Sequence, residues 1–314
     1  MLRYILMRVL ATIPVMMVVA LFVFLMLRLS PGDPAAVIAG DYATAEDVER
    51  IREQLGLNEP IPVQFASWIG ALVQGDLGTS IFSNLPVTQL IAQRLEPTLL
   101  LALTTIFFAV AVAVPLGTVA AWRGGSWIDR FVMLFSVGGF SIPVFVLGYM
   151  LIYALAMGLQ WLPVQGYKSP FEHGLGPFLL HITLPTLTLS VIFIALIARM
   201  TRASVLEVLQ EDYIRTARAK GQSEWKILIR HGLRNAAVPI ITVIGIGIAL
   251  LIGGVVVTES VFNIPGLGRL VLDAVLARDY PIIQGLILFF SFVYILINLL
   301  IDLSYTLLDP RIRY

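Results

Sequence analysis

The chain has 314 residues, of which 58% are hydrophobic and only 13% are charged, and its formal net charge is +1. Soluble domains carry roughly 25% charged residues. This composition and the mean hydropathy of +0.90 therefore exclude an ordinary soluble protein and indicate an integral membrane protein. The sequence has no cysteine, which excludes disulfides, thiolate metal sites and cysteine nucleophiles.

The first apolar run covers residues 1–29 and begins with two basic residues, Arg3 and Arg8. A secretory signal peptide has a shorter apolar stretch and a small-residue cleavage site, and this run has neither feature. We therefore predict a first transmembrane helix with its N-terminus inside the cell. Pro14 is tolerable in such a helix.

Residues 30–95 are polar, and their acidic residues outnumber the basic ones. Because basic residues favour the cytoplasmic side, we predict that this segment is a small helical subdomain outside the cell. Thr44 and Asp47 have the spacing of a capping box, which predicts a short helix that Gly56 ends. Two more helices are expected, from Pro62 to Gln74 and from Pro86 to Leu95.

Five further apolar runs are near or above the roughly 20 residues that a membrane-spanning helix needs. They cover residues 97–122, 130–158, 179–200, 236–257 and 282–303. Basic residues fall in alternate loops, which places the loop 202–235 and the tail 307–314 inside and the loop 259–281 outside. The predicted fold class is thus an all-α integral membrane protein with six transmembrane helices and cytoplasmic N- and C-termini. Residues 96–306 would form its five-helix core.

The loop before the fifth span is crowded with charge, although its flanks are apolar. Residues Asp212 to Lys220 have the pattern of a short helix, and Gly221 is a natural left-handed terminator. Tyr213, Ala217 and Gly221 recur at helical spacing, so we expect one mostly small face suited to close packing against another protein.

A second helix is expected to follow, with Ser223 as its N-cap. Its apolar residues are predicted to share one face and its basic residues the opposite face. The apolar set is Trp225, Leu228, Ile229 and Leu233, and the basic set is Lys226, Arg230 and Arg234. For this helix an alternative is an amphipathic segment lying on anionic lipid.

At these residues the chain resembles the EAA-type cytoplasmic loop of ABC importer permeases, the coupling helix that docks on the ATPase subunit. That loop reads E-A-A, three residues, Gly, nine residues, then I-x-L-P. Ala217, Gly221 and Leu233 fit this pattern, whereas Arg215, Thr216, His231 and Arg234 replace the expected Glu, Ala, Ile and Pro. The departures resemble the peptide-transporter branch, with D-Y-x-R-T-A-R-A-K-G followed by H-x-L-R-N-A.

The resemblance implies a set of coupling residues and a second set that docks an external binding protein. The coupling residues are Asp212, Tyr213, Arg215, Thr216, Ala217, Arg218, Ala219, Lys220, Gly221, His231, Leu233, Arg234 and Asn235. The docking residues are Asp76, Gly78, Asn263, Pro265, Gly266 and Arg269. Segments resembling the family also occur at SPGDP (30–34), QLGL (54–57), GDLG (75–78), FNIPGLGRL (262–270) and DPRIR (309–313).

The chain is thereby identified as similar to B-type permease subunits of the dipeptide, oligopeptide, glutathione and nickel family of binding-protein-dependent ABC importers. Such a subunit lies in the cytoplasmic (inner) membrane of a bacterium or archaeon. The resemblance implies four partners: a second homologous permease in a heterodimer, two ATPase subunits or domains, an external solute-binding protein and the lipid bilayer. It implies no nucleic acid and no cofactor on this chain, because ATP and Mg are used by the partner subunits. The overall pattern is slightly closer to the dipeptide and glutathione branches.

The sequence contains no GxxxxGK[ST] phosphate loop, HExxH motif or GxSxG motif, and its three histidines are isolated. We therefore expect no enzyme activity. Glu259 and Asp302 lie near span ends and are expected to serve packing or an interface. An alternative function is a self-contained secondary transporter or channel, but this predicts intramembrane charges or inverted repeats that the sequence does not show. A membrane enzyme is a third class, disfavoured because no paired catalytic groups are evident.

Overall fold

The computed structural model describes residues 2–28, 34–40, 43–54 and 56–308. Residues 30–33 of the SPGDP segment and the DPRIR segment at 309–313 lie outside the described residues. The described chain is helical, and its one isolated β-bridge pairs Thr79 with Pro86. It divides into two compact units, Met1–Leu95 with Leu270–Leu296, and Glu96–Arg269 with Ile297–Tyr314.

The first unit contains four complete helices, the beginning of α5, most of α13 and the first part of α14. These helices are α1 (Leu2–Arg28), α2 (Pro34–Ala39), α3 (Ala45–Gln54), α4 (Ile61–Val73), α5 (Val87–Trp122), α13 (Leu267–Ala277) and α14 (Tyr280–Leu308). The capping box of α3 is confirmed, because Thr44 Oγ1 accepts from the Asp47 N–H and Asp47 accepts from the Thr44 N–H. The hydrogen bond from the Thr44 hydroxyl also lowers the pKa of Asp47.

The predicted helix at residues 62–74 is confirmed as α4, which begins with Pro at its first turn. Aromatic rings hold it against α1: the Phe24 ring lies 5.1 Å from the Phe65 ring and 5.6 Å from the Trp68 ring between centroids. Elsewhere in this unit the Gln284 amide donates to the Val23 carbonyl at 3.0 Å. The edge-to-face contact between Phe24 and Phe65 stabilises this packing beyond what the burial of apolar area alone supplies.

The prediction that a third external helix ends at Leu95 is wrong. Residues 87–122 form the single 36-residue helix α5, with Pro97 and Pro115 inside it. A proline removes one backbone hydrogen bond and introduces a steric conflict one turn earlier. In α5 the buried side chains continue through the proline, from Ile91 to Leu101. Tertiary packing therefore outweighs the local break that the sequence indicates.

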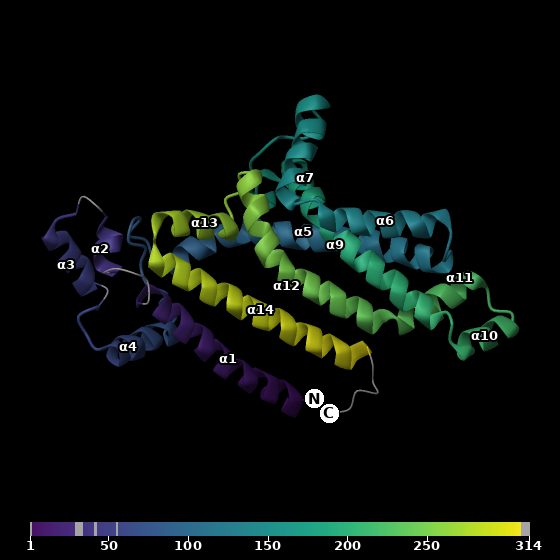
Figure 1. Cartoon of the computed structure of the whole chain (residues 1–314), viewed down its shortest axis with the longest axis horizontal. Helices are drawn as coiled ribbons and strands as arrows, with labels where there is room; N and C mark the ends of the chain where they lie inside the picture. The colour runs from purple at the N-terminus through teal and green to yellow at the C-terminus, as the bar shows by residue number, and fades with distance from the viewer. Residues whose placement is uncertain (1, 29–33, 41–42, 55, 309–314) are drawn as a thin grey trace. The chain divides into compact units, whose positions relative to one another are not determined.

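The second unit contains the remaining helices (Figure 1), and its main apolar cluster forms the core. They are α6 (Trp127–Ser141), α7 (Val144–Leu151), the π-helix η1 (Ile152–Gly158), α8 (Pro170–His173), α9 (Leu175–Val208), α10 (Asp212–Ala219), α11 (Glu224–Lys226), the π-helix η2 (Ile227–Leu233) and α12 (Ala237–Val261). The core takes side chains from α5, α6, α7, η1, α9 and α12. In the most apolar stretch of α9, 61% of the residues are buried, against 22% in α5, which makes α9 the more central helix.

Among the described residues, three helices are long and apolar enough to cross a membrane: Val87–Trp122, Leu175–Val208 and Tyr280–Ser304. Two bent pairs raise this number to five if each pair is one span. The predicted span at residues 130–158 is not one straight helix, because α6 and the α7–η1 helix meet at 104°, and it forms a span only if this bent pair counts as one. Pro143 caps α7, and Ile142 before it is extended, as the residue before a proline prefers.

A glycine allows α5 and α9 to approach closely. A Cβ atom on Gly117 would lie 2.5 Å from the Ala198 carbonyl oxygen and 2.8 Å from Thr201 Cβ. Real Cβ atoms essentially never come this close to backbone, so even one methyl group must push the two helices apart.

Gly117→Ala is therefore expected to lower the free energy of unfolding by roughly 1–3 kcal/mol, as overpacked cores do. Gly138→Ala in α6 is the matched control, since nothing lies within 4 Å of its added Cβ. There the lower helix propensity of glycine should make alanine stabilising by roughly 0.5–1 kcal/mol. The measurement is the unfolding free energy of both variants in detergent, and equal effects would contradict the close approach.

Candidate functional site

Residues 202–235 connect α9 to α12 and contain the last turns of α9 followed by α10, α11 and η2. Figure 1 shows α10 and α11 grouped beyond the end of α9. The predicted short helix Asp212 to Lys220 is confirmed as α10. This group, residues 211–235, is called the loop knob below.

The end of α10 is a Schellman motif centred on Gly221. The Gly221 N–H donates to the Arg218 carbonyl at 2.9 Å, and the Gln222 N–H donates to the Ala217 carbonyl at 3.2 Å. Gly221 has φ of +75°, a left-handed conformation that glycine adopts without steric cost. The predicted role of Gly221 as helix terminator is confirmed.

The predicted small face of α10 is only partly correct. Ala217 is 7% exposed and packs with Ile214 and Ile227, whereas Tyr213 and Gly221 are exposed. The short helix needs its own apolar contact with the chain to be stable, because an isolated helix of this length is marginal in water. Ala217 therefore helps to hold α10 in place and does not lie on the surface.

The predicted faces of the second helix are only partly correct. Leu228 is buried and Leu233 half-buried, as expected, and the basic residues Lys226, Arg230 and Arg234 are exposed. Ile227, Leu228 and Gly232 are buried, whereas Trp225 is 65% exposed and Ile229 is 40% exposed. The reason is that residues 227–233 form a π-helix, whose hydrogen bonds span five residues and alter the repeat of the buried face. The prediction of an N-cap at Ser223 has the right position, but its side chain makes no capping hydrogen bond.

Two neighbouring residues of η2 join the loop knob to the long helices. Ile227 packs into the cluster with Ile214 and Ala217 of α10. Leu228 packs with Val205 of α9 and Ile240 of α12, and Ala121 of α5 belongs to the same cluster. The loop knob thus rests on the ends of three long helices.

Polar contacts tie the parts of the loop knob together. The Arg218 guanidinium donates twice to the Glu224 carboxylate, at 2.9 and 3.3 Å. The Asn235 amide donates to the Tyr213 hydroxyl at 3.2 Å, which connects the first turn of α10 to the start of α12. A ring nitrogen of His231 lies 2.9 Å from Gln222 Oε1.

The predicted coupling residues fall into three groups by exposure. Ala217 is buried, and His231 and Leu233 are half-buried. The exposed ones are Asp212, Tyr213, Arg215, Thr216, Arg218, Ala219, Lys220, Gly221, Arg234 and Asn235. The surface of the loop knob is therefore mostly basic, and it also presents the exposed apolar side chains of Trp225 and Ile229.

A partly buried ion pair connects α6 to the last turns of α9. Asp129 is 4% exposed and receives two hydrogen bonds from the Arg202 guanidinium, at 2.9 and 2.8 Å. The Gly125 N–H also donates to Asp129 at 2.9 Å. The spacing of Ser126 and Asp129 marks the start of α6. It does not indicate the pair with Arg202, which lies 73 residues further along the chain.

The predicted docking residues belong to different compact units. Asp76 and Gly78 lie in the first unit, where the Asp76 carboxylate accepts from the Gly78 N–H at 2.8 Å. In the second unit Asn263 and Pro265 are exposed and Arg269 is half-buried, but Gly266 is buried. Gly266 therefore lies below the surface and cannot itself contact a docked binding protein.

Gly266 is buried because it lies against the carboxylate of Glu259. A Cβ atom at Gly266 would be 2.1 Å from Glu259 Oε1, and one at Gly268 would be 2.5 Å from the Val256 Cα. Glu259 is 0% exposed and accepts from the Thr98 hydroxyl at 2.5 Å and from the Arg269 N–H at 3.0 Å. It thus serves as an acceptor at the N-terminal end of α13, where a negative charge is favourable.

Thr98 completes this network from α5. Its hydroxyl donates to Glu259 and accepts from the Leu267 N–H at 2.7 Å. Two further contacts belong to the same region: the Gly166 N–H donates to the Phe262 carbonyl and the Tyr167 hydroxyl donates to Glu96. Burial raises the pKa of Tyr167, and the hydrogen bond to Glu96 raises it further.

Glu259→Gln is expected to lower the free energy of unfolding by roughly 1–3 kcal/mol, because a neutral amide accepts less strongly and brings a donor into a buried acceptor site. Glu172→Gln is the matched control, since its side chain is 76% exposed. The thermal midpoints of the two variants and the unchanged protein provide the comparison. A Glu259 variant as stable as the control would contradict the network.

The chain matches known protein families and curated proteins along almost its whole length. Residues 113–314 match the model of the family described as binding-protein-dependent transport system inner membrane component, and residues 1–104 match its N-terminal companion. A probable peptide ABC transporter permease protein of Sinorhizobium fredii is 58% identical over 311 residues, covering 99% of each chain. The glutathione transport system permease protein GsiC of Escherichia coli is 47% identical over 315 residues, covering 100% of each chain.

Solved structures support the fold. The chain is similar to a protein in the MetNI methionine ABC transporter in an inward-facing conformation, with a TM-score of 0.57 and 18% identity. The match covers 71% of this chain and 97% of that one. The family matches and the identities to curated permeases together show that this chain is a permease subunit of an ABC importer and belongs to the family of binding-protein-dependent transport system inner membrane components.

Proposed function

We propose that the loop knob is the site where this permease receives the ATPase subunits of its importer. Closure of the ATPases, driven by ATP and Mg bound to them and not to this chain, would move the knob. The movement would alternate the access of the translocation pathway between the two sides of the membrane.

The observation that carries this proposal is the adjacent burial of Ile227 and Leu228. Ile227 anchors α10, and Leu228 anchors η2 to α9, α12 and α5. Because packed interiors resist deformation, a force on α10 passes to the ends of three long helices. A loop that only lay on lipid would need no such link.

The exposed basic side chains suit a protein partner that presents acidic or polar groups. Arg215, Lys220 and Arg234 project from the loop knob, and Arg218 is held in place by Glu224. Complementary charge directs the encounter and fixes the orientation of two proteins. We infer that the basic loop residues Arg123 and Arg130 lie on the same side of the membrane as the loop knob. Because basic residues favour the cytoplasmic side, this side is the cytoplasmic one.

The remaining partners follow from the same assignment. We propose six spans with both termini cytoplasmic, a heterodimer with a second related permease, and an external solute-binding protein that docks on residues 30–95 and 259–281. Asp76, Gly78, Asn263, Pro265 and Arg269 are the candidate surface positions for that docking. Bacterial relatives support a location in the cytoplasmic membrane.

For the substrate we propose a peptide, of the dipeptide, oligopeptide or glutathione class. The support comes from the names of relatives that cover the full chain, a peptide permease at 58% identity and a glutathione permease at 47% identity. Peptides share a charged backbone terminus at each end and an amide core, which a binding protein can recognise without a dedicated site on this chain.

The first experiment is purification of the tagged chain in mild detergent from its native host, followed by identification of every protein that copurifies. We expect ATPase subunits and a second permease, together with peptide uptake into liposomes that requires ATP and the binding protein. A chain that purifies alone and carries peptide without ATP would instead establish a self-contained transporter.

A further inference from the structure

Arg199 is an exposed arginine in an apolar part of α9, where residues 196–198 precede it and Met200 follows it. Its guanidinium carbon lies 5.3–6 Å-class distance from an aromatic face: the centre of the Phe140 ring on α6 is 5.7 Å away. Among the described residues no carboxylate pairs with this guanidinium. The positive charge of Arg199 is therefore in contact with a ring but has no counter-charge from the described chain.

The helices α6 and α9 run antiparallel. Asp129 in the first turn of α6 pairs with Arg202 near the end of α9. Further along α6, a Cβ atom on Gly139 would lie 3.0 Å from the Ala195 Cβ. The end of the helix pair that carries the ion pair is also the end beside the loop knob, because α9 leads into that loop. Depth along the two helices can therefore be measured from the ion pair.

The guanidinium of Arg199 lies well away from that end. The Arg199 backbone is only three residues from Arg202, whereas Phe140 is eleven residues, or about 16 Å, from Asp129 along α6. A helical side chain tilts toward the N-terminus of its helix, and for Arg199 this direction leads away from the loop knob. The contact with Phe140 is thus the opposite of snorkelling, in which a basic side chain near a helix end reaches for the nearer membrane surface.

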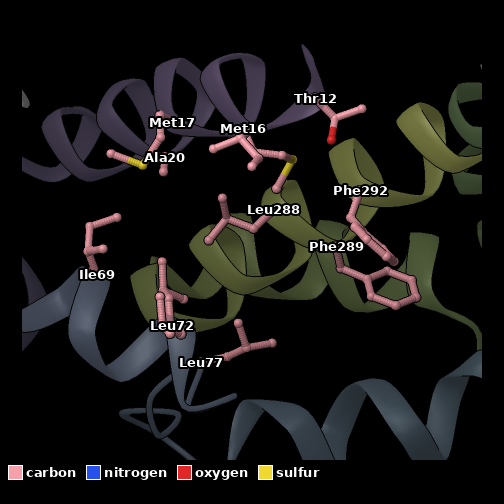
Figure 2. Close-up of a pocket in the computed structure, with 12 residues that line it drawn as sticks. Thr12, Met16, Met17, Ala20, Ile69, Leu72, Leu77, Leu288, Phe289 and Phe292 are labelled. Atoms are coloured by element: carbon pink, nitrogen blue, oxygen red, sulfur yellow. The ribbon is translucent and has the colours of Figure 1, made fainter. Parts of the chain in front are cut away.

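A charge at this depth restricts what can cover it. The open apolar groove of the first unit is a contrast: Figure 2 shows Met16, Leu72 and Phe289 around it, and no charged side chain is among its described lining residues. Lipid or another helix would suit that groove equally. Lipid tails do not suit Arg199, because ionisable side chains inside a membrane face the bundle interior or a water-filled cavity. Lipid phosphates lie at the membrane surface, away from which the Arg199 side chain points.

We propose that Arg199 binds the C-terminal carboxylate of a peptide while the peptide passes through the importer. This rests on the proposed transport of peptides and on a pathway that the second permease helps to form. A guanidinium presents a rigid fork of N–H donors that matches a carboxylate through two parallel hydrogen bonds. Phe140 contacts the guanidinium through its ring and supplies no hydrogen-bond acceptor, so the N–H groups remain available. The binding protein would select the peptide, and Arg199 would act after its release.

An acidic side chain of the second permease would offer Arg199 the same carboxylate chemistry. Such a side chain would hold Arg199 whether or not peptide is present. The two sources therefore differ in one measurable respect: only binding of the peptide makes transport depend on the chemical form of the peptide terminus.

The test compares ATP-driven uptake of a peptide with uptake of its C-terminal amide, by the assembled importer in liposomes. Each ligand is supplied on fully loaded, saturating binding protein, so that capture by the binding protein does not limit the rate. We expect the unchanged importer to transport the acid at least about tenfold faster than the amide, as the loss of a hydrogen bond between charged groups predicts. Arg199→Gln should abolish this preference by slowing the acid, and Arg199→Lys should keep part of it.

Arg123→Gln is the matched control. The Arg123 guanidinium also lies over a ring, 5.3 Å from the centre of Trp122, but it belongs to the turn between α5 and α6. This variant should keep both rates. An unchanged preference in Arg199→Gln would overturn the proposal, and so would equal slowing of acid and amide, which would indicate a fixed pair with the second permease. Failure of the unchanged importer to take up any peptide with ATP would instead contradict the proposed function itself.

A second measurement leaves Arg199 in place. Phe140 is replaced by the photoreactive benzoylphenylalanine, and the importer is illuminated with ATP and with binding protein that carries radiolabelled peptide. We expect a crosslink from position 140 to the peptide. A crosslink from this position to phospholipid or to the second permease, with none to the peptide, would overturn the proposal.

Discussion

Replacing Arg202 with methionine is expected to lower the free energy of unfolding by roughly 2–3 kcal/mol, below the range for a fully buried ion pair, because the Arg202 side chain is 25% exposed. The Asp129 carboxylate, with a side chain 6% exposed, would keep its hydrogen bond from Gly125 but lose both bonds from the guanidinium. Arg202→Lys should recover only part of the loss, because an ammonium group cannot reproduce the two parallel bonds.

The matched control for this prediction is an exposed ion pair. Arg50 pairs with Asp47 on the surface of α3, and Arg50→Ala should change stability by no more than about 1 kcal/mol. The double variant Asp129→Leu with Arg202→Met should regain stability relative to Arg202→Met alone, because no unpaired buried charge remains. Equal stability of Arg202→Met and Arg50→Ala would show that the pair between α6 and α9 does not fasten these helices.

Replacing Gly221 with valine is expected to reduce ATP-driven uptake by at least about tenfold, which corresponds to a shift of roughly 1.4 kcal/mol in the coupling equilibrium. Gly221 has φ of +75°, and a side chain there costs roughly 1–2 kcal/mol in the left-handed conformation. No atom of this chain lies within 4 Å of the added Cβ, so within the chain the cost is that of the backbone conformation. The Schellman motif would open and α10 would lose its fixed end.

Asparagine provides the control at the same position, because it tolerates the left-handed conformation better than valine does. Gly221→Asn should therefore retain most of the uptake, whereas Gly221→Val should hydrolyse ATP without stimulation by the loaded binding protein. The measurements are uptake and ATPase rate of the reconstituted importer, with insertion checked by membrane fractionation. Normal stimulated uptake by Gly221→Val would contradict the role of the loop knob.

The sequence predicted short helices well where a local signal specified the start or the end of the helix. The capping box at Thr44 and Asp47, and the terminator at Gly221, each depend on contacts within a few residues. The long helices were less predictable. Pro97 lies inside α5, whereas Pro143 separates α6 from α7, and the difference arises from packing that a single proline does not encode.

The candidate site shows the same division. The position and charge of the loop knob were readable from the sequence, but its buried face was not. The π-helix at Ile227–Leu233 shifts which residues point inward, and periodicity analysis assumes a regular α-helix. Contacts between distant segments, such as Glu259 with Thr98 and Asp129 with Arg202, leave no spacing signal along the chain.

The central claim is that the loop knob contacts the ATPase subunits, and site-directed crosslinking tests it most directly. The chain has no cysteine, so Ala219→Cys, at an exposed position of α10, provides a unique attachment point. Phe171→Cys is the matched control, since Phe171 is 82% exposed and lies in the loop 160–177, which the alternation of basic loops predicts to be outside. We predict that a thiol-linked photocrosslinker on the assembled importer joins Ala219→Cys to an ATPase subunit and does not join Phe171→Cys to it. A crosslink to the ATPase from Phe171→Cys, with none from a fully labelled Ala219→Cys, would contradict the account.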